Sequence, residues 1–140
     1  IGLLALLAQQ LPVQFQFDCD ELARLIATGG TLARQAQGGT GTQAALAALD
    51  VATLAAGRSL DAARASPADI EAGVRAMRAA TGTLITEVHR DGDAASRKAV
   101  QATVLAMSGE QLLRDRSMLL MQGWEPDPKA IPPLAELLDR

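Results

Sequence analysis

Alanine and leucine dominate this chain, and almost no aromatic side chains accompany them. The 140 residues include 28 alanines and 21 leucines but only three aromatic residues, Phe15, Phe17 and Trp124. Alanine and leucine are strong helix formers, whereas sheets favour β-branched and aromatic residues. The composition therefore predicts an all-α fold and excludes a β-sandwich or β-barrel. A chain that is 49% hydrophobic is also too apolar for a disordered segment.

The length allows a single helical domain over residues 1–140. Residues 1–17 are expected to form an N-terminal flank, a helix followed by an extended segment, and residues 123–140 a proline-rich tail. The opening apolar run, Ile1–Ala8, is too short to cross a bilayer, which takes about 20 residues. We expect it to be a first helix that packs on the core, the alternative being the stub of a cleaved segment or the start of an excised domain.

Local signals divide the middle of the chain into helices. Residues Thr42 to about Ala65 are nearly all helix formers, and Ser66 followed by Pro67 is typical of an N-cap and first helical position. Apolar residues recur every three or four positions on the helices before and after this junction. They are Leu46, Leu49, Thr53, Ala56, Leu60 and Ala63 on the first, and Ile70, Val74, Met77, Thr81, Leu84 and Val88 on the second. Two such helices with a very short connection must pack antiparallel.

A further helix boundary is expected at Asp91-Gly92-Asp93, with Gly92 in the left-handed closing position and Asp93 as the cap. The last long helix is predicted from about Ala94 to Gln122. Trp124–Pro133 contains four prolines and is expected to be mostly extended, before a short helix over Leu134–Asp139. Together, these helix patterns and boundaries predict an antiparallel bundle of about four main helices with short flanking segments.

The N-terminal third is less regular. Val13–Phe17 alternates strictly between apolar and polar residues, which favours a short strand or an extended segment. Asp18 with Glu21 three residues later is typical of a new helix start. Gly29-Gly30 predicts a break, after which residues 31–37 form either a short helix or part of a longer one. The glycine-rich stretch Gly38–Thr42 is predicted to be the true loop.

Glycines also occur inside the predicted helices. We expect them to mark helix axes that approach each other closely, at the short end of the usual 8–10 Å. These glycines are Gly57, Gly73, Gly82 and Gly109.

Few residues suggest chemistry. Cys19 is the only cysteine, so no intrachain disulfide forms and a reduced, cytoplasmic setting is expected. A helix N-terminus would lower the pKa of the Cys19 thiol, but the acidic neighbours oppose this, so a structural thiol is favoured. His89 and the acids around it form the one cluster of potential metal ligands, but their spacing fits neither a calcium loop nor a zinc site. The loop Gly38–Thr42 precedes a helix and is a candidate anion site, although a flexible loop is the favoured interpretation. We therefore predict no catalytic residues, cofactor or metal.

The charge argues against nucleic acid as a partner. The net charge is −3 and the pI about 5.1, with acids interspersed among the basic residues. Pairs such as Glu71 with Arg75 and Glu110 with Arg114 have the four-residue spacing of a solvated helix face. Eleven arginines together with abundant alanine are typical of a GC-rich bacterial genome.

These observations favour a non-enzymatic helical module that acts through protein–protein contact and forms a homodimer. Two extended segments, Val13–Phe17 and Trp124–Pro133, are the expected docking segments, and Trp124 is expected to pin the tail onto the bundle or onto a neighbouring subunit. The candidate interaction residues are Val13, Phe15, Phe17, Met118, Met121, Trp124 and Ile131. The alternative is a sensory or effector-binding bundle that holds a small ligand between helices, in a cavity lined by Met77, Leu84 and Met107.

Overall fold

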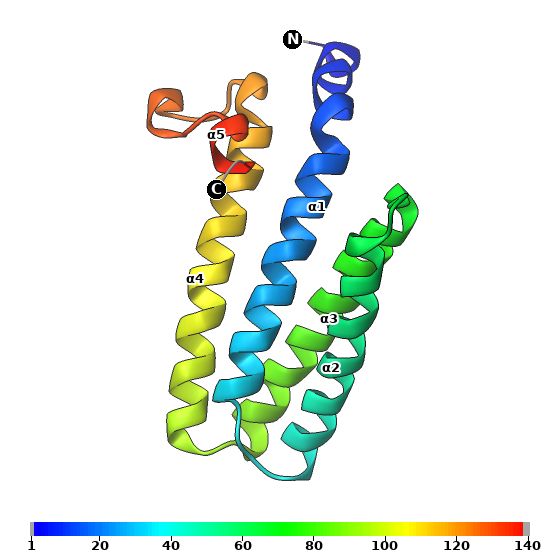
Figure 1. The fold of residues 1–140 in the computed structure, drawn as a ribbon. Coiled ribbons are helices and arrows are strands. Elements are labelled where there is room, and N and C mark those ends of the chain that lie inside the picture. The colour runs from blue at the N-terminus through cyan, green and yellow to red at the C-terminus, as the bar shows by residue number, and fades with distance from the viewer. Residues whose placement is uncertain (1, 139–140) are drawn as a thin grey trace.

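The protein is a bundle of long helices. Its structure, a computed structural model, describes residues 2–138, with the side chains of Gln9, Pro12 and Met121 outside the description. The elements are α1 (Leu3–Gln35), α2 (Thr40–Asp61), α3 (Pro67–Asp91), α4 (Ala94–Met118), the 3₁₀ turns η1 (Leu120–Gln122) and η2 (Pro128–Ala130), and α5 (Leu134–Leu138) (Figure 1). The described residues are thus all-helical, as predicted. The expected number of about four main helices is approximate, because shorter helical segments follow the long ones.

Successive long helices run in opposite directions, and α1 lies in the middle of the molecule (Figure 1). Helices α2 and α3 pack on each other and on one side of α1, whereas α4 lies on its other side and contacts α3 much less. The end of α1 that begins at Leu3, together with the end of α4 and α5, extends beyond the α2–α3 turn. None of the helices within residues 2–138 combines the length and apolar character of a bilayer-spanning segment.

The helix starts around α3 and α4 agree with the sequence. The side chain of Ser66 accepts a hydrogen bond from the Asp69 amide, and that of Asp93 accepts one from the Ser96 amide at 2.7 Å. All six residues of the apolar stripe on α3 are buried. On α2, Leu49 and Ala56 are buried, while Ala63 is exposed beyond the helix end. The periodicity therefore locates the core face of both helices.

The prediction of an extended segment at Val13–Phe17 is wrong, because α1 is one helix of 33 residues. Val13 and Phe17 are four residues apart, so they also share one face of a helix, and Phe17 is buried while Phe15 on another face is exposed. Burial continues along that face at Leu25 and Leu32. A five-residue alternation does not distinguish such a helix from a strand.

The predicted helix start at Asp18 and the predicted break at Gly29-Gly30 are likewise wrong, and residues 31–35 continue α1. A Cβ at Gly29 would lie 3.1 Å from the Met77 Cε and 3.3 Å from the Thr53 Oγ1. Gly29 thus marks a close approach of three helices, and the packing of α1 against α2 and α3 outweighs its low helix propensity.

The loop predicted at the second glycine cluster is confirmed, although α2 begins at Thr40. Gly92 closes α3 with a φ of −75°, so the expected left-handed conformation is wrong. Gly38 and Gly92 form an antiparallel bridge, and a Cβ at Gly38 would lie 2.9 Å from the Gly92 Cα. Glycine is needed there because two loop backbones touch.

The close helix approach expected at four glycines is found only at Gly73. A Cβ there would lie 3.1 Å from the Leu22 Cδ2, whereas one at Gly57, Gly82 or Gly109 would meet nothing within 4 Å. At these three positions glycine reflects no tight packing against the described residues.

Helix α4 ends at Met118, earlier than predicted, and η1 is closed by Gly123 with a φ of 73°. The following tail is extended apart from η2, and α5 confirms the predicted short helix up to Leu138; the expected end at Asp139 lies outside the described residues. Ile131 and Leu137 are buried and attach the tail to the bundle.

Candidate functional site

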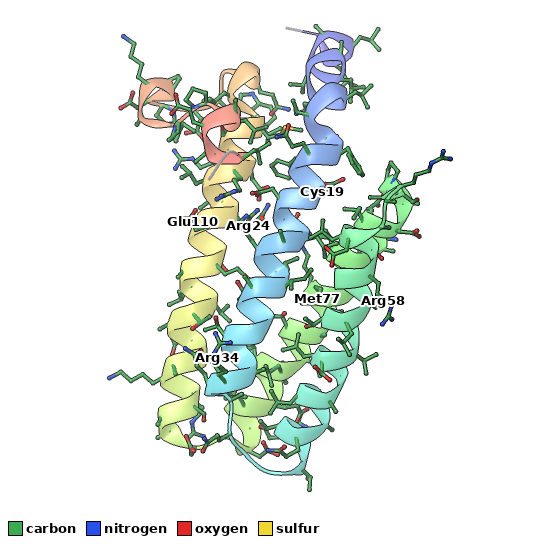
Figure 2. All side chains as sticks on the ribbon, viewed as in Figure 1. Cys19, Arg24, Arg34, Arg58, Met77 and Glu110 are labelled. Carbon is green, nitrogen blue, oxygen red and sulfur yellow. The ribbon has the colours of Figure 1, made fainter. Side chains whose placement is uncertain are left out.

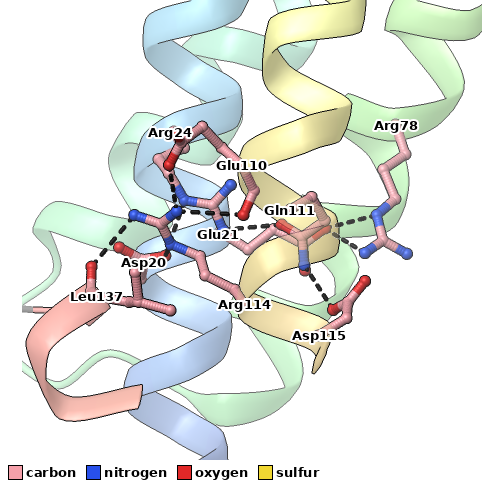
Figure 3. Close-up of polar contacts among 9 residues, drawn as sticks. All are labelled: Asp20, Glu21, Arg24, Arg78, Glu110, Gln111, Arg114, Asp115 and Leu137. Atoms are coloured by element: carbon pink, nitrogen blue, oxygen red, sulfur yellow. Dashed lines mark hydrogen bonds and ion pairs between the residues drawn. The ribbon is translucent and has the colours of Figure 1, made fainter. Parts of the chain in front are cut away.

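A group of charged side chains lies between α1, α4 and the adjoining helices. Figures 2 and 3 show Arg24 of α1 and Glu110 of α4 within it. We call this group the charged junction. Its members are Asp20, Glu21, Arg24, Arg78, Glu110, Gln111, Arg114 and Asp115.

Arg114 is the centre of the junction, with only 5% of its side chain exposed. Its Nε donates to the Asp20 Oδ2 at 2.8 Å, its Nη1 to the Glu110 Oε2 at 2.7 Å, and its Nη2 to the Leu137 carbonyl at 3.1 Å. The planar guanidinium presents several donors in fixed directions, which suits it to such a three-way contact. One side chain of α4 therefore connects α1 and α5.

The hydrogen bonds continue across the face of α1 and α4. Arg24 donates from Nε to Asp20 and from Nη2 to the Gln111 Oε1, each at 2.8 Å, and Gln111 donates to the Asp115 Oδ1 at 2.9 Å. In a separate contact, Arg78 of α3 forms an ion pair with the buried Glu21. The expected helix cap at Glu21 is replaced by this link between α1 and α3.

Each carboxylate of the junction has a hydrogen-bond partner. The Asp20 and Glu21 carboxylates accept hydrogen bonds from arginine, and Asp115 accepts one from the Gln111 amide. The arrangement favours a structural role, in which the charges fix α4 and α5 on α1.

Two open grooves lie along α4, one between α3 and α4 and the other among α1, α3 and α4. The first, of about 280 Å³, lies near the loop end and is mostly apolar, with Arg97, His89 and Gln101 at its edges. Its apolar lining consists of Ile85, Val88, Val100, Val104 and Leu105. The second, of about 230 Å³, adjoins the charged junction and includes Leu112. Both exist because α4 packs mainly on α1 and leaves its side toward α3 partly uncovered.

The candidate anion site at Gly38–Thr42 is occupied by a carboxylate of the chain itself. The Asp91 Oδ2 accepts from the Gly41 amide at 2.8 Å, and the Asp91 Oδ1 accepts from the Thr42 amide at 3.2 Å and from the Thr42 hydroxyl. These hydrogen bonds, that of the Thr42 side chain above all, lower the pKa of Asp91 below its ordinary value of 3.8. Asp91 thus caps the N-terminus of α2 from the end of α3.

Replacing this carboxylate with an amide tests the cap. Asp91→Asn should lower the melting temperature at pH 7 by about 5 °C, because the α2 amides lose a charged acceptor. The folded state lowers the pKa of Asp91, so its stabilising effect is full above pH 3.8 and is lost as the pH falls through the lower folded value. Thermal unfolding followed by circular dichroism at several pH values should show the two proteins converging in acid.

The matched control is Asp50→Asn, at an exposed aspartate of α2. It should leave the melting temperature nearly unchanged. An equal lowering of the melting temperature in both variants would contradict the role of Asp91 as a cap. So would a lowering by Asp91→Asn that persists in strong acid.

The structure separates the other residues considered for chemistry. Cys19 lies inside α1, not at a helix start, and burial followed by the charge of Asp18 raises the pKa of its thiol. His89 is exposed in the last turn of α3, while Asp91 faces the glycine loop. Among the described residues no three His, Cys, Asp or Glu side chains are grouped to hold a metal ion.

The predicted interaction residues do not form one surface. Phe17 and Ile131 are buried, and Val13 and Met118 are half-buried. Phe15 is exposed, Trp124 is 80% exposed, and the Met121 side chain lies outside the described part. The expectation that Trp124 pins the tail onto its own bundle is therefore wrong, since Ile131 and Leu137 do so.

The sequence analysis missed most of the exposed apolar surface. Large hydrophobic side chains are exposed on the outer faces of α1, α2 and α4 and on the tail. Within residues 2–138 they include Leu3, Leu4, Leu7, Leu11, Phe15, Val51, Leu54, Leu105, Leu112, Leu119 and Trp124. Of residues 2–8, the described part of the opening run that was expected to pack on the core, only Leu6 is buried. One signal was present in the sequence: Leu105, Leu112 and Leu119 follow each other at intervals of seven.

Comparison with known proteins gives no relative that would assign these surfaces a role: no family model matches the chain, and neither curated proteins nor solved structures show a significant match.

Proposed function

We propose that the protein is a non-enzymatic helical interaction module that acts through protein–protein contact and associates with itself. The observation that carries this proposal is the set of large apolar side chains exposed on the outer faces of α1, α2 and α4. Isolated exposed apolar residues are ordinary, but rows of them along helices are typical of interaction surfaces.

Helix α2 is an example of a helix with exposed apolar side chains on its outer face. Leu49 and Ala56 face the core, yet Val51 and Leu54 are 68% and 58% exposed on the opposite side. A helix that is apolar on both sides is usually buried on both sides. Contact with another protein surface would supply the missing burial.

The alternative of a ligand site between the helices has less support. Met77 and Leu84, two of the three residues expected to line a cavity, are fully buried, and Met77 packs close to Gly29. The third, Met107, is half-buried and lines open grooves between α1 and α4. The single cysteine supports a reduced, cytoplasmic setting, and the arginine and alanine content supports an origin in a GC-rich bacterium. Both remain parts of the proposal.

Mass measurement tests the self-association. In size-exclusion chromatography with light scattering, we expect the mass to rise with protein concentration from 14.6 kDa toward twice that value. The burial of apolar surface between copies is the physical reason. A mass that stays at that of one chain up to the highest soluble concentration would contradict self-association.

A further inference from the structure

We propose that the C-terminal tail, residues 123–138, is exchanged between two copies of this chain, so that α5 of each copy docks between α1 and α4 of the other. This inference rests on the proposed self-association and names the segment that performs it. The docking site has a defined occupant, because the tail of the chain itself already lies there, with α5 against α4 and α1 (Figure 1). The same sequence in a second copy fits the same site.

The tail is held by apolar contacts that are separate from the main core. Ile131 and Leu137 are 6% and 1% exposed, so the bundle covers both side chains. The buried residues of the main core lie between Leu22 and Val100 and include neither of them. A five-residue helix such as α5 is too short to be stable alone, so it needs these contacts. The tail can therefore leave its site while the packing of the long helices is kept.

Buried donors of α4 recognise the backbone of the tail. The Arg114 Nη2 donates to the Leu137 carbonyl at 3.1 Å (Figure 3), and the Ser117 Oγ donates to the Pro132 carbonyl at 2.7 Å. Arg114 and Ser117 are 4% and 6% exposed. A buried donor that loses its partner is destabilising. An open site therefore favours the tail of either copy, since both tails offer the same two carbonyls.

The turn between α4 and the tail carries a cost in the closed form. Gly123 has a φ of 73° and is the one residue of the described chain with a positive φ. Beside it, the Gln122 Oε1 is buried and accepts no hydrogen bond from the described residues. A buried acceptor without a donor is destabilising, and unfolding of η1 would let water reach it. Opening of this hinge thus removes an unfavourable feature of the closed chain.

Exchange preserves the contacts of the tail. About a two-fold axis, each tail makes in the second copy the contacts that it makes in its own chain. The ion pair of Arg116 with Glu125 is kept in the same way or replaced by water, since the Arg116 side chain is 43% exposed. The difference in free energy between closed monomer and dimer is therefore set by the hinge and by the loss of translational freedom. We expect the exchanged dimer to accumulate as the protein concentration rises.

A substitution at the hinge tests the exchange in the full chain. Gly123→Ala places a side chain at a positive φ, which disfavours the closed turn, whereas an open hinge has no such constraint. The dissociation constant of the dimer, measured by analytical ultracentrifugation, should fall at least about tenfold. Gly57→Ala, at a helical glycine with no described atom within 4 Å of its Cβ position, is the matched control and should leave the dissociation constant unchanged.

Mixing of two variants tests the docking site itself. Ser117→Asp puts a carboxylate opposite the Pro132 carbonyl and so excludes tails from its own site, whereas Leu137→Asp removes the apolar anchor of the tail and leaves the site intact. Each variant alone should be monomeric. When mixed, they should form a one-to-one complex at least about tenfold tighter than the wild-type dimer, because no tail of the same chain competes for the open site. Ala135→Asp, at an exposed position of α5, is the matched control for Leu137→Asp and should not form this complex.

The possible results separate exchange from other modes of self-association. A wild-type dimer whose dissociation constant is unchanged by Gly123→Ala would overturn the exchange while self-association stands. Mixed Ser117→Asp and Leu137→Asp chains that keep their helix content by circular dichroism but do not associate would equally overturn it. A wild-type chain that stays monomeric at every concentration would refute both proposals.

Discussion

Arg114→Met should lower the free energy of unfolding by about 3 kcal/mol, because breaking a buried ion pair leaves its partners unsatisfied. The substitution keeps the length of the apolar stem but removes all donors. The Asp20 carboxylate would lose one of its two arginines, and the Leu137 carbonyl would lose its hydrogen bond. Urea unfolding followed by circular dichroism at pH 7 measures the loss.

The matched control is Glu110→Gln, which also removes an ion pair of Arg114. The Glu110 side chain is 61% exposed, so water replaces the lost contact and the cost should be below about 1 kcal/mol. Arg114→Lys should fall between the two, because an ammonium lacks the fork that reaches three acceptors. If Arg114→Met is no less stable than Glu110→Gln, the charged junction does not hold α4 and α5 on α1.

The partners in this junction show what the sequence can and cannot predict. Glu110 and Arg114 are four residues apart, and their ion pair follows from helix spacing alone. Arg114 and Asp20 are 94 residues apart, and Arg78 and Glu21 are 57 apart. Such pairs arise only when whole helices are placed side by side, and no local pattern specifies that placement.

The same distinction between local patterns and the placement of whole helices applies to the fold. Ser66, Pro67 and the stripe on α3 were predictable because capping and periodicity are local properties. Residues 13–17 and Gly29-Gly30 in α1 were not, because packing against α2 and α3 overrides their weak local preference for other structures. Leu105, Leu112 and Leu119 of α4 can be recognised in the sequence as a seven-residue repeat, but only the structure shows that they are exposed.

The second large change in the free energy of unfolding is expected at the contact between Leu22 and Gly73. Leu22 is fully buried, and its Cδ2 lies 3.1 Å from the position of a Cβ on Gly73. Leu22→Ala should cost about 3 kcal/mol, since it removes buried methyl groups and leaves a cavity between α1 and α3. Gly73→Ala should then recover about 1–2 kcal/mol, because the new methyl enters that cavity and alanine is the better helix former.

In the wild-type chain Gly73→Ala should gain little or nothing, because the new methyl would crowd Leu22 and offset the gain in helix propensity. Gly82→Ala, on the same helix with nothing within 4 Å of its Cβ position, should instead add about 0.5–1 kcal/mol in both backgrounds. Urea unfolding of the resulting double-mutant cycle isolates the coupling. If Gly73→Ala behaves like Gly82→Ala in both backgrounds, the two helices are not in close contact there, and glycine at position 73 serves no packing role.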